Sequence, residues 1–496
     1  MLIADLVATS AAVAATRSRK DKTAALAALL SRVETSDLET VVSYLSGSLR
    51  QRRTGLGWRS MQSLPSPATD SSLTVGEVHD ELERIAGLSG AGSQAERAAA
   101  VEAMFGRATA DEQRWLRGLI TGEVRQGALD SLVQDALAAA AGVPVAAVRR
   151  AAMMAGSTVS IAAAAFDGDE ALSTFVLEVG RPVQPMLAST APSIAEAVTK
   201  AGGGAVAVDT KLDGIRVQAH KHGDDVVLAT RSLDDITARL PEVVGVVRSL
   251  PAHDAVLDGE VLAIGPDGRP RPFQETASRT AQASGVVVTP YFFDLLHVDG
   301  RDLTDSPGSE RLDALAALVP EAHLVARLVT SSVDEAEEFS RSVLAAGHEG
   351  VVVKNLDAPY AAGRRGSAWV KVKPVHTLDL VVLAVEWGSG RRTGLLSNIH
   401  LGTREGIMLG KTFKGMTDEM LAWQTERFLA LADGPTDGWV VKVRPEQVVE
   451  IAFDGLQRST RYPGGLALRF ARVVRYRDDK TADEADTLET VQSFVR

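Results

Sequence analysis

The hexapeptide Lys211–Arg216 places an amine, a carboxylate, a flexible backbone position and a fixed cation side by side, in the order Lys-Leu-Asp-Gly-Ile-Arg. A lysine amine is a nucleophile only in its neutral form, which neighbouring positive charge and partial desolvation favour. The same positive charge would hold a nucleoside triphosphate in line for attack. Lys211 is therefore a candidate covalent carrier of a nucleotide. A solvated Lys-Asp turn is the alternative interpretation of this motif taken alone.

Two further stretches place a carboxylate beside a glycine and a run of strand-forming residues. In Leu257–Glu260 the acid follows a predicted strand, where it could reach a ribose hydroxyl or a magnesium ion, and in Glu349–Lys354 the acid precedes one. Mg²⁺ typically takes one or two carboxylates together with phosphate oxygens and water. Glu260 and Glu349 are therefore candidate magnesium ligands that arrive from two strand ends. Each alone could equally be a solvated carboxylate.

The segment Trp369–Lys373 alternates apolar and basic residues. In a strand, this period projects Lys371 and Lys373 from one face and sends Val370 and Val372 into the core. Two ammonium groups on one face repel each other unless they share an anion, and a phosphate would be that anion. The pair would then help to lower the pKa of Lys211. An edge strand kept soluble by lysine is the alternative.

Aromatic residues at Tyr291–Asp294 offer rings for stacking on a nucleotide base, a contact worth about 1–3 kcal/mol per base. Periodicity does not choose between Phe292 and Phe293 as the stacking ring. Near the end of the sequence, Arg477–Lys480 is either a charged surface segment or a segment that folds over the leaving pyrophosphate.

The elements that must position these residues divide the sequence into three parts. Up to about residue 170 the apolar spacing is helical, with capping-box signals at Ser36 and Thr109 and a third helix at 129–137. The glycine-bounded turn Gly122–Gly127 contains Arg125 and could meet a phosphate backbone, or could simply connect two helices. This first part is predicted to be all-helical.

After Arg181–Pro185 short strand-like runs replace the helical pattern. Runs at 206–208, 226–228, 256–257, 286–288, 291–293 and 351–353, with a helix near 332–346, predict an α+β domain. From about Pro374 the pattern changes again. Strand-like runs at 380–385, 407–409, 440–443 and 448–453, with one helix at 417–431, suit a small β-barrel.

Composition bounds the class of protein. The chain has 496 residues, 45% of them hydrophobic and 24% charged, which is typical of a globular protein of several domains. The chain has no cysteine, which excludes disulfides and thiolate metal sites. It also has no apolar run long enough for a membrane span. We therefore expect a cytoplasmic protein. The net charge is −11, but nucleic-acid binding follows local charge. Basic residues cluster at Arg364, Arg365, Lys371, Lys373, Arg458, Arg461, Arg469, Arg472, Arg475, Arg477 and Lys480.

In order along the chain, these pieces resemble the motif set of ATP-dependent DNA ligases, members of the covalent nucleotidyltransferase superfamily. The helical first part resembles the DNA-binding domain of that family, and the last part resembles its oligonucleotide-binding (OB-fold) barrel. The motifs that carry the resemblance are Lys211–Arg216, Thr230–Ser232, Leu257–Glu260, Phe293–Asp294, Glu349–Lys354, Lys371–Lys373 and Arg477–Lys480.

The resemblance implies a role for each matching residue. Lys211 becomes adenylated, Phe293 stacks on adenine, and Glu260 and Glu349 serve Mg²⁺. Asp209 stands where the family usually has glutamate, which shortens the side chain that contacts adenine. Arg364 and Arg365 are adjacent, and either could be the arginine that contacts the nucleotide. The nucleotide contacts implied are Asp209, Arg216, Arg231, Glu260, Phe293, Arg365, Lys371 and Lys373, the last of these on the α-phosphate.

We therefore expect a multidomain ligase: a helical DNA-binding domain at 1–175, a nucleotidyltransferase domain at 181–374 and an OB-fold domain at 375–496. It would use ATP and Mg²⁺ to seal nicks in duplex DNA, as a monomer with no membrane partner, in DNA repair, replication or recombination. An RNA ligase or capping-type nucleotidyltransferase is one alternative. An NAD-dependent ligase resembles the chain less in domain order and usually carries a cysteine zinc site. A catalytically silent DNA-binding clamp is an alternative of a different class.

Overall fold

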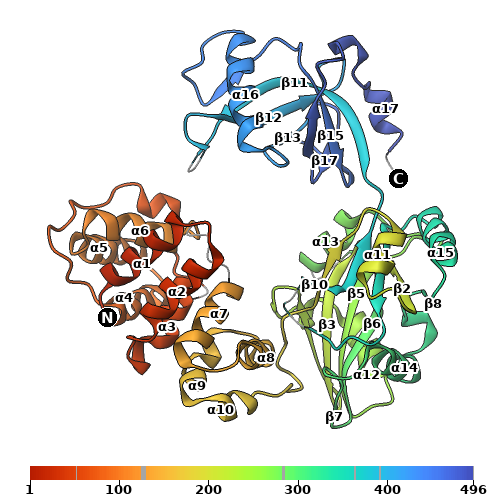
Figure 1. The fold of residues 1–496 in the computed structure, drawn as a ribbon, viewed down its shortest axis with the longest axis horizontal. Helices are drawn as coiled ribbons and strands as arrows, with labels where there is room; N and C mark the ends of the chain where they lie inside the picture. Colours follow the sequence, from red (N-terminus) through yellow and green to blue (C-terminus); the bar gives the residue numbers. More distant parts are fainter. Residues whose placement is uncertain are drawn as a thin grey trace.

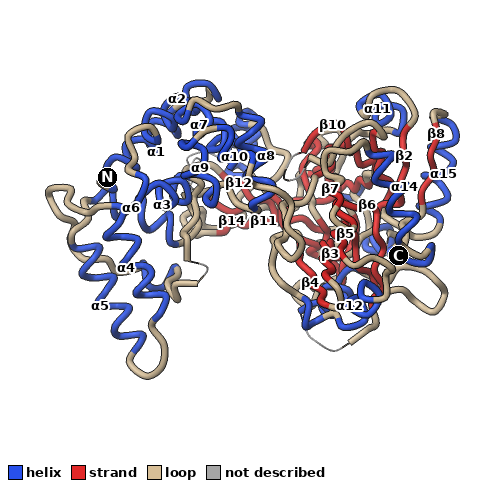
Figure 2. The backbone as a smooth tube through the Cα atoms, turned by 90° about the horizontal axis from the view of Figure 1, so that it is seen from below, coloured by secondary structure: helices blue, strands red, loops and turns tan. Residues whose placement is uncertain are grey.

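The computed structural model describes residues 1–51, 53–124, 130–281, 285–361, 363, 365–389 and 392–494. Figure 1 shows three separate bodies: a helical part, a part built on two sheets, and a C-terminal part that leaves the two-sheet part through a long strand. In Figure 2 the helices of the first part lie on one side and most strands on the other. None of the described helices has the length and apolar character needed to span a bilayer.

The helical part packs around one core of Leu, Val, Ile and aromatic side chains, which includes Tyr44, Phe105 and Leu116. Its α6 helix begins at the predicted capping box, where Thr109 Oγ1 accepts from the Glu112 amide and the Glu112 carboxylate accepts from the Thr109 amide. The α3 helix begins at Thr35, so Ser36 lies inside its first turn and the capping box expected there is absent. The helices are α1 (Ile3–Ala15), α2 (Arg19–Leu30), α3 (Thr35–Leu45), α4 (Val75–Gly87), α5 (Ser93–Gly106), α6 (Ala110–Ile120), α7 (Asp130–Ala141), α8 (Val145–Ala155), α9 (Ala162–Asp167) and α10 (Asp169–Ser173).

The first sheet of the middle part carries the Lys211 strand. Helices α11 (Ile194–Lys200) and α15 (Val333–Ala345) pack on it around Val206, Val208 and Val353. As expected from the alternation, Val370 and Val372 belong to this core. The strand order is β1 (Leu187–Thr190), β10 (Arg365–Val372), β9 (Gly350–Asn355), β2 (Val206–Lys211) and β8 (Arg327–Thr330).

The second sheet of the middle part has its own core, formed with helices α12 (Pro241–Arg248) and α14 (Gly308–Leu318). A further helix, α13 (Phe273–Ala281), contacts β5 and β3. The predicted strand at 286–288 begins only at Val288. The strand order is β4 (Asp225–Thr230), β3 (Ile215–His222), β5 (Asp254–Ala263), β6 (Val288–Val298) and β7 (Arg301–Asp302).

The C-terminal part is a sheet around a separate core, covered by α16 (Asp418–Ala430), with α17 (Leu488–Gln492) near the end of the chain. Among the described residues the strand order of this sheet is open, so strand pairing does not close the predicted barrel. Its strands run β13 (Met408–Thr412), β12 (Leu396–Gly402), β11 (His376–Trp387), β15 (Val448–Phe453) and β18 (Arg472–Tyr476), with β14 (Val440–Lys442) also pairing with β11 and a hairpin of β16 (Gly455–Arg458) and β17 (Leu466–Arg469).

Candidate active site between two sheets

A cavity of about 900 Å³ lies where the two sheets of the middle part face each other. Strands β2, β9 and β10 line it from the first sheet, and β3, β5 and β6 line it from the second. Most of the expected nucleotide contacts meet here although they are far apart in the sequence. The lining includes Asp209, Lys211, Arg216, Thr230, Arg231, Ser232, Glu260, Phe293, Lys354, Trp369 and Lys371.

Lys211 is the last residue of β2, and its amine lies beside a carboxylate. Its Nζ donates to Glu349 Oε2 and, at 3.4 Å, to the Leu212 carbonyl oxygen. Burial lowers the pKa of the Lys211 amine, but the carboxylates of Glu349, Glu260 and Asp213 raise it by more, so the net shift is upward. The expectation that basic neighbours lower this pKa is therefore wrong for the protein alone, because the nearest charges are acidic.

Glu349 precedes β9, as predicted, and is shared by two lysines. Lys373 Nζ donates to Glu349 Oε1 at 3.1 Å, on the opposite side of the carboxylate from Lys211. Lys373 also donates to Asp454 of the C-terminal part. Burial would raise the pKa of Glu349, but Lys211 and Lys373 lower it by more. Two of the motif residues are thus joined through one ionised carboxylate.

Glu260 differs from its predicted position. It lies inside β5, because β5 pairs with β3 and β6 on both sides and continues past the glycine. Gly259 does not end the strand: a Cβ there would lie 2.7 Å from Phe292 Cδ1, so glycine is required by close packing. Glu260 Oε1 accepts from the Gly214 amide at 3.0 Å. Burial raises the pKa of Glu260 to about 7, against the opposing effects of Lys211 and Arg216.

Asp209 lines the cavity and is almost fully buried. Lys354 Nζ lies 2.7 Å from its Oδ2, and Arg327 Nη2 donates to the same oxygen at 2.9 Å. Burial would raise the pKa of Asp209, but these two cations hold it below its usual value. Sequence reasoning gave Lys354 no role and missed Arg327. Lys354 could have been found from the sequence because it ends the motif Glu349–Lys354. Arg327 belongs to no motif, so the sequence offered no indication of its position.

Arg216 is held rigidly on β3 rather than left free in the cavity. Its Nε and Nη2 donate to the two oxygens of buried Asp258 at 2.9 and 2.6 Å, and its Nη1 donates to the Met186 carbonyl at 2.6 Å. Tyr360 donates a further hydrogen bond to Asp258 at 2.6 Å. Such bidentate pairing fixes the plane of a guanidinium. Arg216 therefore presents a fixed positive edge to the cavity.

The two adjacent phenylalanines of β6 lie in different surroundings. Phe292 is fully buried in the core of the second sheet, whereas Phe293 lines the cavity. Phe293 meets Trp369 edge to face with ring centroids 5.9 Å apart. The ammonium of Lys354 lies 4.7 Å from the Phe293 ring centre and 4.2 Å from that of Trp369. An aromatic wall backed by a cation is thus available to a planar base.

Not every predicted contact can be placed at the cavity. Arg231 and Lys371 line it, but Lys373 turns toward Glu349 and Asp454. Arg364, the side chain of Arg365 and residues 125–129 with Arg125 lie outside the described residues. Arg53, from the helical part, also lines the cavity, although sequence reasoning assigned it nothing.

The segment Arg477–Lys480 lies on the C-terminal part and is not among the residues that line the cavity. Arg477 Nη1 and Lys480 Nζ donate to Asp379 Oδ2 at 2.9 and 2.7 Å, and Arg477 also pairs with Asp479 at 2.7 Å. In this arrangement Arg477 and Lys480 form ion pairs within the C-terminal part, to Asp379 on β11.

Comparison with known proteins follows the same three parts. Residues 185–373 match the family described as ATP dependent DNA ligase domain, residues 59–138 match DNA ligase N terminus, and residues 392–480 match ATP dependent DNA ligase C terminal region. A probable DNA ligase from Nocardioides sp. is 68% identical across all of this chain and 99% of its own length. The chain belongs to the ATP-dependent DNA ligase family.

Other relatives of this family agree with that assignment. A probable DNA ligase from Kineococcus radiotolerans is 65% identical over the full length of both chains. The solved structure Pmar-Lig_PreS3 has a TM-score of 0.62 at 17% identity, covering 95% of this chain and 99% of that one, which shows a shared fold. As a member of the ATP-dependent DNA ligases, the chain is an enzyme.

Proposed function

We propose that this enzyme seals nicks in duplex DNA by way of an adenylate carried on Lys211. Lys211 Nζ would attack the α-phosphorus of ATP, forming a P–N bond while the bond to pyrophosphate breaks and the amine releases a proton. An oxygen of the 5′-phosphate at the nick would then attack the AMP phosphorus, forming a P–O–P bond while the P–N bond breaks and the Lys211 amine takes up a proton. The 3′-hydroxyl would attack the 5′-phosphorus, forming the phosphodiester while the bond to AMP breaks, and AMP and a proton would be released. Each step is a displacement at phosphorus, which depends on positioning and charge stabilisation.

The observation that carries this proposal is the place of the Lys211 amine in the cavity. Fixed cations and an aromatic wall surround the same space, and its volume suits a nucleotide. The roles we propose follow from position: Phe293 for adenine, Asp209 below it, Arg216 and Arg231 for ribose and phosphate, and Lys371 for phosphate. Lys373 would reach the α-phosphate only after exchanging its present carboxylate partners, and Arg365 remains a proposed nucleotide contact from the motif alone.

Glu260 and Glu349 would hold Mg²⁺. The donor set fits this ion: Glu349 accepts from the Lys211 amine, and the charges of Glu349 and Glu260 both raise the pKa of that amine, so two carboxylates act on the same point of the site. When bound, Mg²⁺ supplies charge neutralisation on phosphate oxygens. The residues themselves hold the amine, through Glu349, and the backbone of the lysine motif, through the Gly214 amide on Glu260. Release of Lys211 from Glu349 is the change that the amine needs before attack.

The domain limits we propose are 1–175, 181–374 and 375–496. For the C-terminal domain we propose an OB-type barrel, because the two outer strands of its sheet approach each other. Val473, on β18, donates its amide to the Lys414 carbonyl just after β13 at 2.9 Å, and Thr412 Oγ1 donates to the Ala471 carbonyl at 2.6 Å. The helical domain and this barrel would grip DNA through phosphate contacts, in a salt-sensitive manner. Such an enzyme would serve DNA repair, replication or recombination.

The proposal is tested by incubating the full chain with α-labelled ATP and Mg²⁺, followed by nicked duplex DNA. We expect one covalent label, lost in Lys211→Ala and retained in Lys200→Ala, whose lysine lies on α11 outside the cavity lining. Undiminished label in Lys211→Ala would overturn the mechanism. Labelling from GTP in place of ATP, or sealing of RNA and not nicked DNA, would favour an RNA ligase or capping enzyme. No label at all on the unaltered chain would favour a silent clamp.

A further inference from the structure

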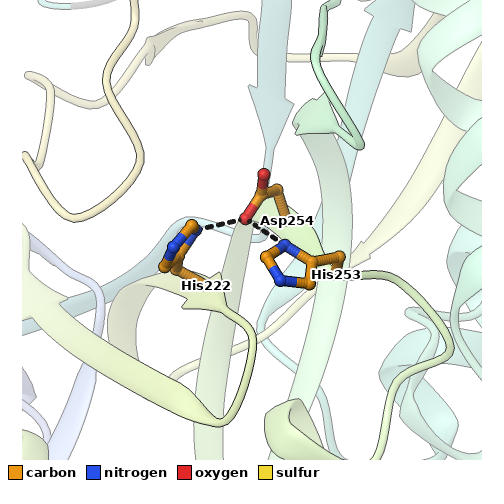
Figure 3. Close-up of side chains that lie close together, drawn as sticks. All are labelled: His222, His253 and Asp254. Carbon is orange, nitrogen blue, oxygen red and sulfur yellow. Dashed lines mark hydrogen bonds and ion pairs between the residues drawn. The ribbon is translucent and has the colours of Figure 1, made fainter.

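Two histidines and an aspartate meet on the second sheet, at the end remote from the cavity. His222 Nδ1 lies 2.6 Å from Asp254 Oδ1, and His253 Nδ1 lies 3.0 Å from the same oxygen. Figure 3 shows both rings turned toward this carboxylate. The two rings meet edge to face with centroids 5.0 Å apart. Three side chains with metal-binding atoms thus converge on one point.

The backbone holds this convergence in place. His222 ends β3 and is the direct cross-strand partner of Asp254, which begins β5, so their side chains share one face. His253 lies just before the strand, where the Gly223 amide donates to its carbonyl at 2.8 Å. Asp299 Oδ1 accepts from the amides of His253 and Asp254 at 2.8 and 2.9 Å. The main chain that carries the three side chains is therefore ordered before any ligand binds.

The donor set selects the kind of ion. Two imidazole nitrogens and one carboxylate oxygen suit Zn²⁺ and related transition metals, whereas Mg²⁺ prefers oxygen alone. One potential ligand atom from each residue lies within 4.8 Å of the other two. Zinc bonds of about 2.0–2.2 Å place tetrahedral ligand atoms roughly 3.4 Å apart. Each imidazole nitrogen would therefore move away from Asp254 Oδ1 by less than about 1 Å as the ion enters between them. The imidazoles are 68% and 66% exposed, which leaves them free to make this movement.

We propose that His222, His253 and Asp254 bind a divalent transition-metal ion of the Zn²⁺ class, with water completing the coordination. The ion would join the end of β3 to the start of β5. The cavity lies at the other end of β3, roughly 20 Å along the strand at about 3.3 Å per residue. The site would therefore stabilise the second sheet and would not take part in the adenylate chemistry.

The test uses the full chain after chelator treatment, titrated with Co²⁺ and with Zn²⁺ at pH 7.5. We expect one equivalent of Co²⁺ to give the visible absorption of a low-coordinate nitrogen and oxygen site. His222→Ala and Asp254→Asn should each weaken Zn²⁺ binding by at least about tenfold, the loss that even outer partners of metal ligands cause. Zn²⁺ should raise the melting temperature of the unaltered chain and not that of the variants.

His323→Ala is the matched control, because this histidine lies in the same part of the chain and contacts the Pro290 carbonyl instead of the cluster. It should bind Zn²⁺ like the unaltered chain. Asp254→Asn keeps the size of the side chain and one acceptor oxygen for the two histidines, so a loss of Zn²⁺ binding there is attributed to the lost carboxylate. If neither variant weakens Zn²⁺ binding, or if the unaltered chain binds none, the three residues form only a hydrogen-bonded surface cluster and the proposal is wrong.

Discussion

Asp213 and Arg469 form an ion pair between parts of the chain that are 256 residues apart. The guanidinium donates to the two carboxylate oxygens at 2.6 and 3.3 Å. A second link lies nearby, where Lys373 donates to Asp454. The C-terminal part is therefore tied to the motif that contains Lys211.

Removing both links should loosen the C-terminal part. We combine Arg469→Ala with Asp454→Asn so that neither ion pair can hold the C-terminal part when the other is lost. The expected result is a larger radius of gyration in small-angle X-ray scattering. The control combines Arg475→Ala with Glu446→Gln, which breaks ion pairs within the C-terminal part alone. Equal radii for the two double variants would show that the links do not hold the parts together.

Glu349→Gln should shift the pH dependence of lysyl-AMP formation to lower pH. Burial lowers the pKa of Lys211, and Glu349 is the leading group that raises it. Without that charge the neutral amine is populated at lower pH, even if loss of a carboxylate slows the reaction at every pH. Single-turnover labelling across a pH series measures the midpoint. Glu446→Gln, at an exposed ion pair, should leave it unchanged, and a midpoint that stays in place or rises in Glu349→Gln would contradict the assignment.

Glu260→Gln should raise the free energy of unfolding above that of the unaltered chain, and this gain should be larger at pH 8 than at pH 5. Burial raises the folded-state pKa of Glu260 from 4.5 to about 7. Between these values the unfolded chain loses its proton first, so the contribution of this carboxyl to the free energy of unfolding falls as pH rises, by up to about 3 kcal/mol. Gln keeps an acceptor for the Gly214 amide without the charge. Thermal unfolding of both proteins at the two pH values measures the difference, which should be several-fold smaller at pH 5, just above the unfolded-state pKa, than at pH 8. An equal difference at both pH values would refute the raised pKa.

Phe293→Ala should weaken ATP binding. A stacked base contributes about 1–3 kcal/mol, which corresponds to about a 5- to 150-fold change in dissociation constant. Phe293→Leu keeps an apolar side chain beside Trp369 but removes the ring. Its affinity for ATP should therefore lie between that of the unaltered chain and that of Phe293→Ala. Phe166→Ala changes an exposed ring on the helical part and serves as the control. Titration of ATP against the full chain provides the measurement, and an unchanged affinity in Phe293→Ala would place adenine elsewhere.

The sequence by itself determined the local elements and the order of the motifs. The apolar period and the Thr109 capping box predicted α6, and the alternation at Trp369–Lys373 predicted which side chains of β10 enter the core. These two features depend only on residues within a few positions along the chain, so they can be predicted without knowing the tertiary structure. Lys211 was also singled out in this way as a candidate, and in the structure it is one of the residues that line the cavity.

Only the tertiary structure decided which groups meet. Periodicity could not tell Phe292 from Phe293, because it gives the two faces of a strand but not which face meets a cavity. The partners of Asp209 come from β8 and β9, and those of Asp254 and Lys211 come from other strands or loops. The Lys211 pKa moved opposite to expectation for the same reason: electrostatic shifts depend on distance in space, and acids distant in sequence are its nearest charged neighbours.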